Sequence, residues 1–126
     1  MSGFLIDSNV LLWWLRRDDR LIRGGHYDRI NTTRAVFLSV LSPWELWIKH
    51  AAGKLPMGSD LAERIREAGF TVLTPTLVEA ELAARLPLIH KDPFDRMLVA
   101  QAISHGLPLM TSDELLGQYG VKVILV

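Results

Sequence analysis

Residues 3–15 have the sequence GFLIDSNVLLWWL, in which Asp7 joins a short apolar run to a longer amphipathic segment. The run 3–6 is typical of a strand buried on both faces. Runs of the same kind recur at residues 35–39, 70–73, 107–110 and 121–126. Because segments with helix signals lie between them, we expect an α/β fold with a central parallel sheet and right-handed crossovers.

The composition indicates one soluble domain spanning residues 1–126. Apolar residues make up 49% of the 126 positions, which suits a single continuous core. Fourteen basic and fourteen acidic side chains cancel, so nucleic-acid binding would depend on local placement of positive charge. The absence of cysteine excludes disulfide scaffolds, thiolate zinc sites and cysteine nucleophiles, and favours the cytoplasm. No stretch approaches the roughly 20 apolar residues of a membrane span, so we expect no membrane partner.

Three segments carry clear signals for the start of a helix. Residues 42–45 (SPWE) offer a capping serine, a proline at the first helical position and a glutamate two residues later. Residues 92–95 (DPFD) repeat this pattern, and the helix that they open should stop at Gly106. Residues 76–79 (TLVE) form a third such start. We therefore expect Glu45 and Asp95 in the first turns of their helices.

Four acids are placed to meet at one edge of the predicted sheet. Asp7 and Asp113 follow predicted strands, while Glu45 and Asp95 lie at helix starts. In parallel α/β sheets, ligands collect outside the carboxyl ends of the strands. Each acid taken singly also fits an ordinary role as a helix cap or a first-turn acid. Their joint placement favours a functional site.

A metal ion is the natural partner for such a cluster. Adjacent carboxylates repel one another and raise each other's pKa unless a cation neutralises them. Oxygen-only ligands favour Mg²⁺, with Mn²⁺ as an alternative, over zinc. The histidines form no zinc-binding pattern, and we expect them at the surface or satisfied by hydrogen bonds; they are His26, His50, His90 and His105. Phosphodiester hydrolysis by a metal-activated water fits this ligand set.

Four stretches form a pattern that is more specific together than any one is alone. They are residues 5–15 (LIDSNVLLWWL), 42–46 (SPWEL), 90–102 (HKDPFDRMLVAQA) and 109–113 (LMTSD). In this order and spacing they resemble the PIN-domain nucleases, and specifically the VapC-type toxins of bacterial toxin–antitoxin pairs. The resemblance implies a three-layer α/β/α sandwich, Mg²⁺- or Mn²⁺-dependent endonucleolytic cleavage of single-stranded RNA, and inhibition by a cognate antitoxin.

The resemblance also implies roles for individual residues. Asp7, Glu45, Asp95 and Asp113 match the acidic quartet of the family. Among them Asp7, Asp95 and Asp113 are expected as metal ligands, and Glu45 as a ligand through water or as the group that orients the attacking water.

Four further residues are secondary candidates. Asp92 is expected to cap its helix beside the site, and Ser8 stands where many relatives carry threonine. Ser112 is placed to orient Asp113 or a water molecule. Arg96 is the basic residue that we favour for contact with RNA phosphates, ahead of Lys49, Lys54 and Lys91 near the site and of the run of arginines from Arg16 to Arg23.

The tryptophans bear on partners. Most are expected in the core, but the adjacent pair Trp13-Trp14 cannot bury both side chains on one helix face, so one of them is a candidate for contact with a partner. The resemblance offers two such partners, a second copy of the chain in a homodimer and an antitoxin in a hetero-oligomer. The sequence does not choose between them.

Two other functions compete with the nuclease hypothesis. A phosphatase that forms an aspartyl phosphate would also place an aspartate after its first strand, but that chemistry needs a second aspartate where this chain has Asn9. A catalytically silent domain that only binds RNA or protein would use the same acids as helix caps.

Overall fold

The computed structural model describes residues 3–126, so residues 1 and 2 of the predicted domain lie outside it. Its centre is a parallel sheet of five strands in the order β3-β2-β1-β4-β5. The strands are β1 (Phe4–Ile6), β2 (Val36–Ser39), β3 (Thr71–Leu73), β4 (Leu109–Thr111) and β5 (Val123–Leu125). Each strand overlaps one of the predicted apolar runs, so the expected parallel α/β sheet is confirmed.

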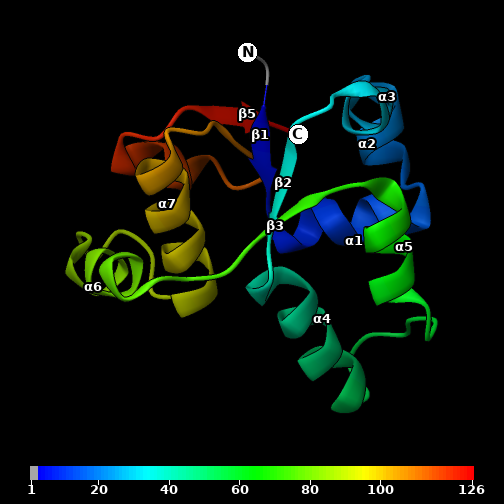
Figure 1. The fold of residues 1–126 in the computed structure, drawn as a ribbon, viewed down its shortest axis with the longest axis horizontal. Helices are drawn as coiled ribbons and strands as arrows, with labels where there is room; N and C mark the ends of the chain where they lie inside the picture. Colours follow the sequence, from blue (N-terminus) through cyan, green and yellow to red (C-terminus); the bar gives the residue numbers. More distant parts are fainter. Residues whose placement is uncertain (1–2) are drawn as a thin grey trace.

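Helices cover both faces of the sheet. They are α1 (Ser8–Arg16), α2 (Asp19–Arg23), α3 (His26–Thr32), α4 (Leu41–Ala51), α5 (Leu61–Ala68), α6 (Leu77–Arg85) and α7 (Pro93–His105), with a 3₁₀ helix η1 (Glu114–Tyr119). Figure 1 shows α1, α2, α3 and α5 on one side of the sheet, α6 and α7 on the other, and α4 beyond the carboxyl ends of the strands. This is the expected three-layer α/β/α arrangement. No helix within residues 3–126 is long and apolar enough to cross a membrane.

The strands are buried on both faces because successive side chains point in opposite directions. In β1, Phe4 and Ile6 pack into a core with α1 and α5, whereas Leu5 packs into a second core with α7. All three side chains are fully buried. The run of consecutive apolar residues in β1 is therefore the pattern of a central strand in a three-layer fold.

Two of the three predicted helix starts are confirmed. Thr76 and Glu79 form a reciprocal capping box at α6, and Asp92 caps α7 by accepting a hydrogen bond from the backbone N–H of Phe94 at 2.8 Å. Gly106 ends α7 in the left-handed conformation, with φ of 64°. Glycine adopts this conformation without the strain that a Cβ would bring.

The predicted cap at Ser42 is wrong. Helix α4 begins two residues earlier than expected, at Leu41 instead of Pro43, because Val40 already has helical backbone angles. The hydroxyl of Ser39 accepts the backbone N–H of Leu41 at 3.2 Å, while the Ser42 side chain is buried. The connection from β2 to α4 is thus too short to hold Ser42 in the extended conformation that a capping residue adopts.

The strand order places a crevice at the carboxyl end of the sheet. Strands β2 and β3 extend to one side of β1, and β4 and β5 to the other. The connections that leave β1 and β4 therefore diverge, and such a switch point is where ligands bind in open α/β sheets. Asp7 and Asp113 both lie at this point.

Candidate metal centre

Asp7 and Asp113 follow the two strands that flank the crevice, and each also caps the helix after it. Asp7 accepts the backbone N–H of Val10 at 2.9 Å, which caps α1. Asp113 accepts the N–H of Leu115 at 3.0 Å through Oδ1, which caps η1. The structural and functional roles proposed for these two acids are thus compatible, because a cap occupies only part of the hydrogen-bonding capacity of a carboxylate.

Glu45 is oriented by contacts to its carboxylate. The Ser8 hydroxyl donates a hydrogen bond to Oε1 at 2.6 Å, and the Lys49 ammonium lies 3.3 Å from Oε2. The earlier start of α4 moves Glu45 out of the first turn, where the sequence placed it. Ser8, a secondary candidate, lies inside the site as the partner of Glu45.

Asp95 lies in the first turn of α7, as predicted, and faces an unexpected neighbour. Nε2 of His90 is 3.3 Å from Oδ2 of Asp95 and 3.0 Å from Oδ2 of Asp113. Ligand atoms of these three side chains all lie within 4.8 Å of one another. Asp92 is close enough for its charge to act on Asp95 while its own side chain caps α7.

The pKa values of two acids show that the carboxylates influence one another. Burial raises the pKa of Asp7, and the charges of Glu45 and Asp113 raise it further, against hydrogen bonds from Thr111 and from the backbone of Val10. Burial, followed by the charge of Asp92, raises the pKa of Asp95 to about 7. Asp7 and Glu45 contribute in the same direction. The four acids of the quartet are therefore electrostatically connected.

The donor set fits a hard divalent cation. The quartet offers carboxylate oxygens only, which are the ligands that Mg²⁺ and Mn²⁺ prefer. A cation would favour the charged forms of Asp7 and Asp95, which burial and like charges now disfavour. These residues therefore suit a divalent metal ion.

Two residues of the site were not predicted from the sequence. His90 was expected to be an ordinary surface or satisfied histidine, yet it bridges two acids of the quartet. Thr111, fully buried at the end of β4, accepts the backbone N–H of Asp113 at 3.0 Å and forms a side-chain hydrogen bond with Asp7. Thr111 thereby has the orienting position that we expected for Ser112, which is exposed. Neither role follows from a short pattern in the sequence, because each depends on a carboxylate from another part of the chain.

Arg96 lies outside the crevice, contrary to the expectation that it contacts RNA. Its side chain is buried, and its guanidinium donates hydrogen bonds to backbone carbonyls at the end of α6 and in the following loop. These carbonyls belong to Ala83, Ala84, Leu86, Pro87 and His90. Cations are favourable at helix carboxyl ends, so Arg96 joins α7 to α6 and to the loop that carries His90.

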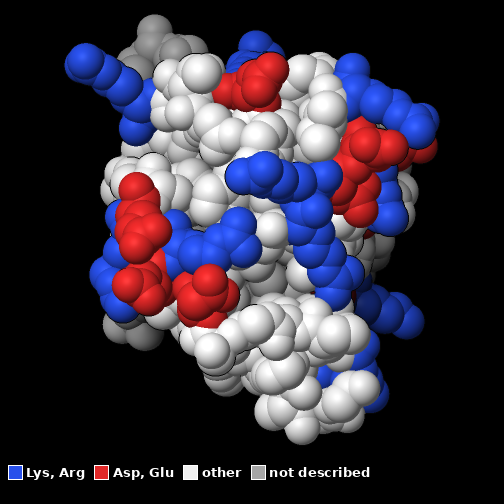
Figure 2. All heavy atoms as spheres, turned by 90° about the vertical axis from the view of Figure 1, so that its right-hand side faces the viewer, with Lys and Arg blue, Asp and Glu red and all other residues white. Residues whose placement is uncertain are grey.

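Three arginines at and after the end of α1, namely Arg16, Arg20 and Arg23, contact other groups of the protein. Figure 2 shows Lys and Arg side chains across the middle of the face formed by α1, α2, α3 and α5. Arg20 and Arg23 pair with Asp18 and Asp19. Arg16 donates a hydrogen bond to the carbonyl of Pro56 at 2.9 Å. This basic run lies at the opposite end of α1 from Asp7.

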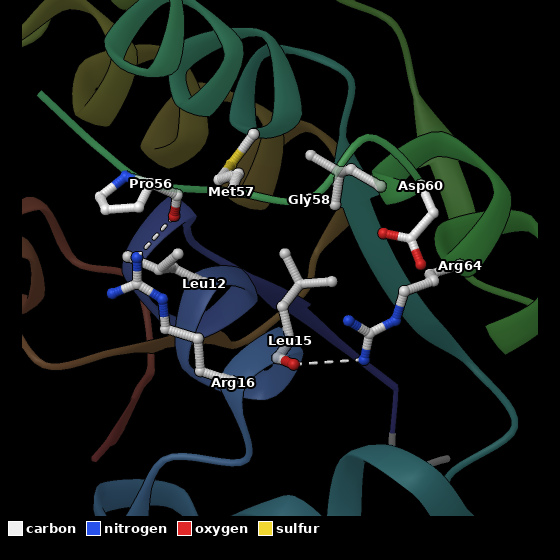
Figure 3. Close-up of a pocket in the computed structure, with 9 residues that line it drawn as sticks. Leu12, Leu15, Arg16, Pro56, Met57, Gly58, Asp60 and Arg64 are labelled. Atoms are coloured by element: carbon white, nitrogen blue, oxygen red, sulfur yellow. Dashed lines mark hydrogen bonds between the residues drawn. The ribbon is translucent and has the colours of Figure 1, made fainter. Parts of the chain in front are cut away.

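Arg16 also borders a pocket that lies away from the acids (Figure 3). The pocket is formed by α1, the loop before α5 and α5 itself, and apolar side chains such as Leu12 and Leu15 line it. Arg64 closes another side by donating a hydrogen bond to the Leu15 carbonyl at 3.2 Å. None of the predicted site residues lies in this pocket.

The exposed tryptophans are not those that we expected. Trp14 is buried against Phe70, and Trp13 stacks under the guanidinium of Arg20. Trp44 and Trp47 on α4 are instead 52% and 40% exposed. Helix α4 presents these rings because it projects beyond the sheet and is covered on only part of its circumference (Figure 1).

Comparison with known proteins identifies the family. The model of the PIN domain matches residues 4–122. The chain belongs to the PIN domain family. It is 33% identical to Ribonuclease VapC22 of Mycobacterium tuberculosis over 121 residues, which cover 90% of this chain and 88% of that protein.

Solved structures share this PIN fold. DNA-bound VapBC from Salmonella typhimurium matches with a TM-score of 0.70 at 17% identity, covering 98% of this chain and 97% of that one. FitAcB from Neisseria gonorrhoeae matches with a TM-score of 0.69 at 19% identity, covering 95% of each chain. The resemblance to PIN domains found in the sequence is therefore confirmed.

Proposed function

We propose that this PIN domain is a metal-dependent endoribonuclease that cleaves single-stranded RNA and acts as the toxin of a toxin–antitoxin pair. The observation that carries the proposal is the convergence of Asp7, Glu45, Asp95 and Asp113 at the switch point of the sheet, with burial and mutual repulsion raising the pKa of two of them. The chain is similar to a ribonuclease over most of its length, and this similarity supports RNA as the substrate.

In this proposal Asp7, Asp95 and Asp113 hold Mg²⁺ or Mn²⁺. A bound ion of this kind lowers the pKa of its water and stabilises the charge that develops on a phosphate. Glu45, fixed by Ser8 and Lys49, accepts a hydrogen bond from the attacking water and orients it. The chain needs no side-chain nucleophile.

A groove beside the acids offers a path for the RNA backbone. Glu45, Lys49 and Lys91 line it together with Phe94, and both lysines are exposed. Lysines bind phosphate oxygens without reading base identity. We therefore assign phosphate contact to Lys49 and Lys91, in place of Arg96.

The proposal predicts RNA cleavage by the purified chain with Mg²⁺ or Mn²⁺, and its loss with EDTA. Asp7→Asn and Asp95→Asn should each abolish cleavage while the protein stays folded. Cleavage that survives both changes would overturn the site. A folded wild-type protein that cuts no RNA would instead favour a binding module. Hydrolysis of small phosphate esters that depends on Asp7 would favour the phosphatase.

The partners follow from the same proposal. Solved structures that share this fold include a toxin–antitoxin complex from Klebsiella pneumoniae and a member of the VapBC family of toxin–antitoxin systems, and an antitoxin is the partner that we infer here. Trp44 and Trp47 give α4 an exposed apolar face suited to a protein partner, either the antitoxin or a second copy of the chain. Co-expression with the gene product encoded next to this one, followed by size-exclusion chromatography, tests the assignment. Unrelieved toxicity without a complex would contradict it.

A further inference from the structure

We propose that His90 is a positioning residue of the metal centre: its Nε2–H holds the carboxylates of Asp95 and Asp113 together and stays bonded to Asp113 when the ion is present. The inference rests on the proposed function, because it concerns the same site. Nε2 lies 3.0 Å from Asp113 Oδ2, to which it is hydrogen-bonded, and 3.3 Å from Asp95 Oδ2, so the ring edge lies between two acids that come from separate elements.

The hydrogen bonds of the ring determine which nitrogen carries the proton. The backbone N–H of Asp92 donates to Nδ1 of His90 at 3.2 Å. A ring nitrogen that accepts a hydrogen bond bears no proton, so the neutral ring is protonated at Nε2. Nε2 therefore donates to Asp113, lies beside Asp95, and has no lone pair for a metal ion. This geometry gives His90 an orienting role and not that of a ligand.

The backbone of His90 is fixed on both sides. Its N–H donates to the Tyr119 hydroxyl at 2.8 Å, and its carbonyl accepts from Nη1 of Arg96 at 3.1 Å. Tyr119 belongs to η1, the helix that Asp113 caps, and Arg96 follows Asp95 in α7. The two elements that carry the acids thus also hold the histidine between them.

The Nε2–H of His90 also orients the carboxylate of Asp113. Oδ1 of this carboxylate accepts the N–H of Leu115, and Oδ2 accepts from His90. Both oxygens are therefore oriented, and each keeps a further lone pair for an ion. Without the N–H, the facing oxygens of Asp95 and Asp113 would repel and turn apart. Loss of such an orienting partner lowers metal affinity about 10- to 100-fold in other proteins.

The test is the affinity of the full chain for Mn²⁺, measured by titration calorimetry and by the electron paramagnetic resonance signal of free Mn²⁺. His90→Ala should weaken binding about 10- to 100-fold. His90→Gln should restore most of it, because the glutamine amide can donate from nearly the same place. His105→Ala is the matched control, since His105 also pairs with a carboxylate, that of Glu79 at 3.2 Å, but at the opposite end of α7. It should leave affinity unchanged.

Three results would overturn the inference. Unchanged or tighter binding by a folded His90→Ala variant would show that the histidine does not support the ion. A nitrogen bound directly to Mn²⁺ in pulsed resonance spectra would make His90 a ligand. Failure of His90→Gln to restore affinity, with its metal-free melting temperature intact, would exclude the Nε2–H of His90 as the cause. A wild-type chain that binds no Mn²⁺ would instead overturn the proposed function itself, and this inference with it.

Discussion

The Ser8 hydroxyl donates a 2.6 Å hydrogen bond to Glu45, a residue 37 positions later in the chain. This bond connects the start of α1 to α4 and fixes one carboxylate oxygen of Glu45. The other oxygen faces Lys49. Glu45 therefore has a defined orientation although it is the only acid of the quartet on a helix that projects beyond the sheet (Figure 1).

Loss of this hydroxyl should reduce RNA cleavage. A hydrogen bond to a charged group contributes about 1.5–3 kcal/mol, so Ser8→Ala should lower kcat/KM about 10- to 100-fold if the bond is needed in the transition state. Ser8→Thr keeps the hydroxyl and should retain most activity. Single-turnover cleavage of a labelled RNA measures the effect, with Ser59→Ala in an exposed loop as the control. Equal rates for Ser8→Ala and wild type would contradict this role.

Two substitutions of Asp7 separate its role as a cap from its charge. The side-chain oxygen of an asparagine would still accept the N–H of Val10, so Asp7→Asn should keep the cap and remove a buried carboxylate whose pKa is raised. We expect the metal-free Asp7→Asn protein to be more stable than wild type at pH 8. Asp7→Ala also loses the cap and should be less stable than Asp7→Asn by about 1 kcal/mol. Urea denaturation in EDTA measures both, and equal stability of the two variants would contradict the capping role.

Much of this fold was predictable because its signals are local. Apolar runs indicate strands buried on both faces. Residues such as Thr76 and Asp92 indicate helix starts, because their side chains accept hydrogen bonds from backbone N–H groups a few positions later. The exception was Ser42, where a short connection from β2 decided the helix start. A local capping pattern therefore mispredicts the start of a helix where the connection from the preceding strand is too short for the capping residue to be extended.

The site was predictable only in part. The four acids follow from the topology, because strand ends and helix starts meet at one edge of a parallel sheet. The roles of His90 and Thr111 depend on contacts with Asp113 and Asp7 from another part of the chain, and that of Arg96 on backbone carbonyls 6 to 13 positions earlier. No short sequence pattern predicts these contacts. Arg96 stands next to Asp95 in the chain, yet its side chain points to the end of α6 instead of the crevice.

The raised pKa of Asp95 should make the stability of the metal-free protein fall as pH rises. Its pKa is about 7 in the folded state against an ordinary value of 3.8, so between these values the folded state holds more protons than the unfolded state. The free energy of unfolding therefore decreases from about pH 4 to pH 7. Asp95→Asn should reduce this slope without abolishing it, because Asp7 acts in the same direction. Identical slopes in urea denaturation series for wild type and variant would contradict the assignment.

The same ionisation should couple metal binding to pH. Binding of Mn²⁺ requires the charged form of Asp95, so affinity should increase with pH up to about 7 and level off above it. Calorimetry at pH 6 in buffers of different ionisation enthalpy should detect proton release on binding. At pH 8.5 the release should be much smaller. Binding that releases no proton at either pH would show that Asp95 is already ionised or takes no part.

Substitution of Arg96 should mainly lower the stability of the protein and have a smaller effect on RNA binding. Lysine retains the charge but not the planar fork that reaches several carbonyls, so Arg96→Lys should cost about 1–3 kcal/mol of unfolding free energy. Lys91→Ala, on the exposed groove, should leave stability within about 0.5 kcal/mol and weaken RNA binding with a smaller salt dependence. Denaturation curves and filter binding with a cleavage-defective Asp7→Asn background measure the two effects. If Arg96 contacted phosphate instead of the α6 carbonyls, lysine would replace it with little loss of stability. An unchanged denaturation midpoint for Arg96→Lys, together with weaker RNA binding, would therefore restore the role first expected from the sequence.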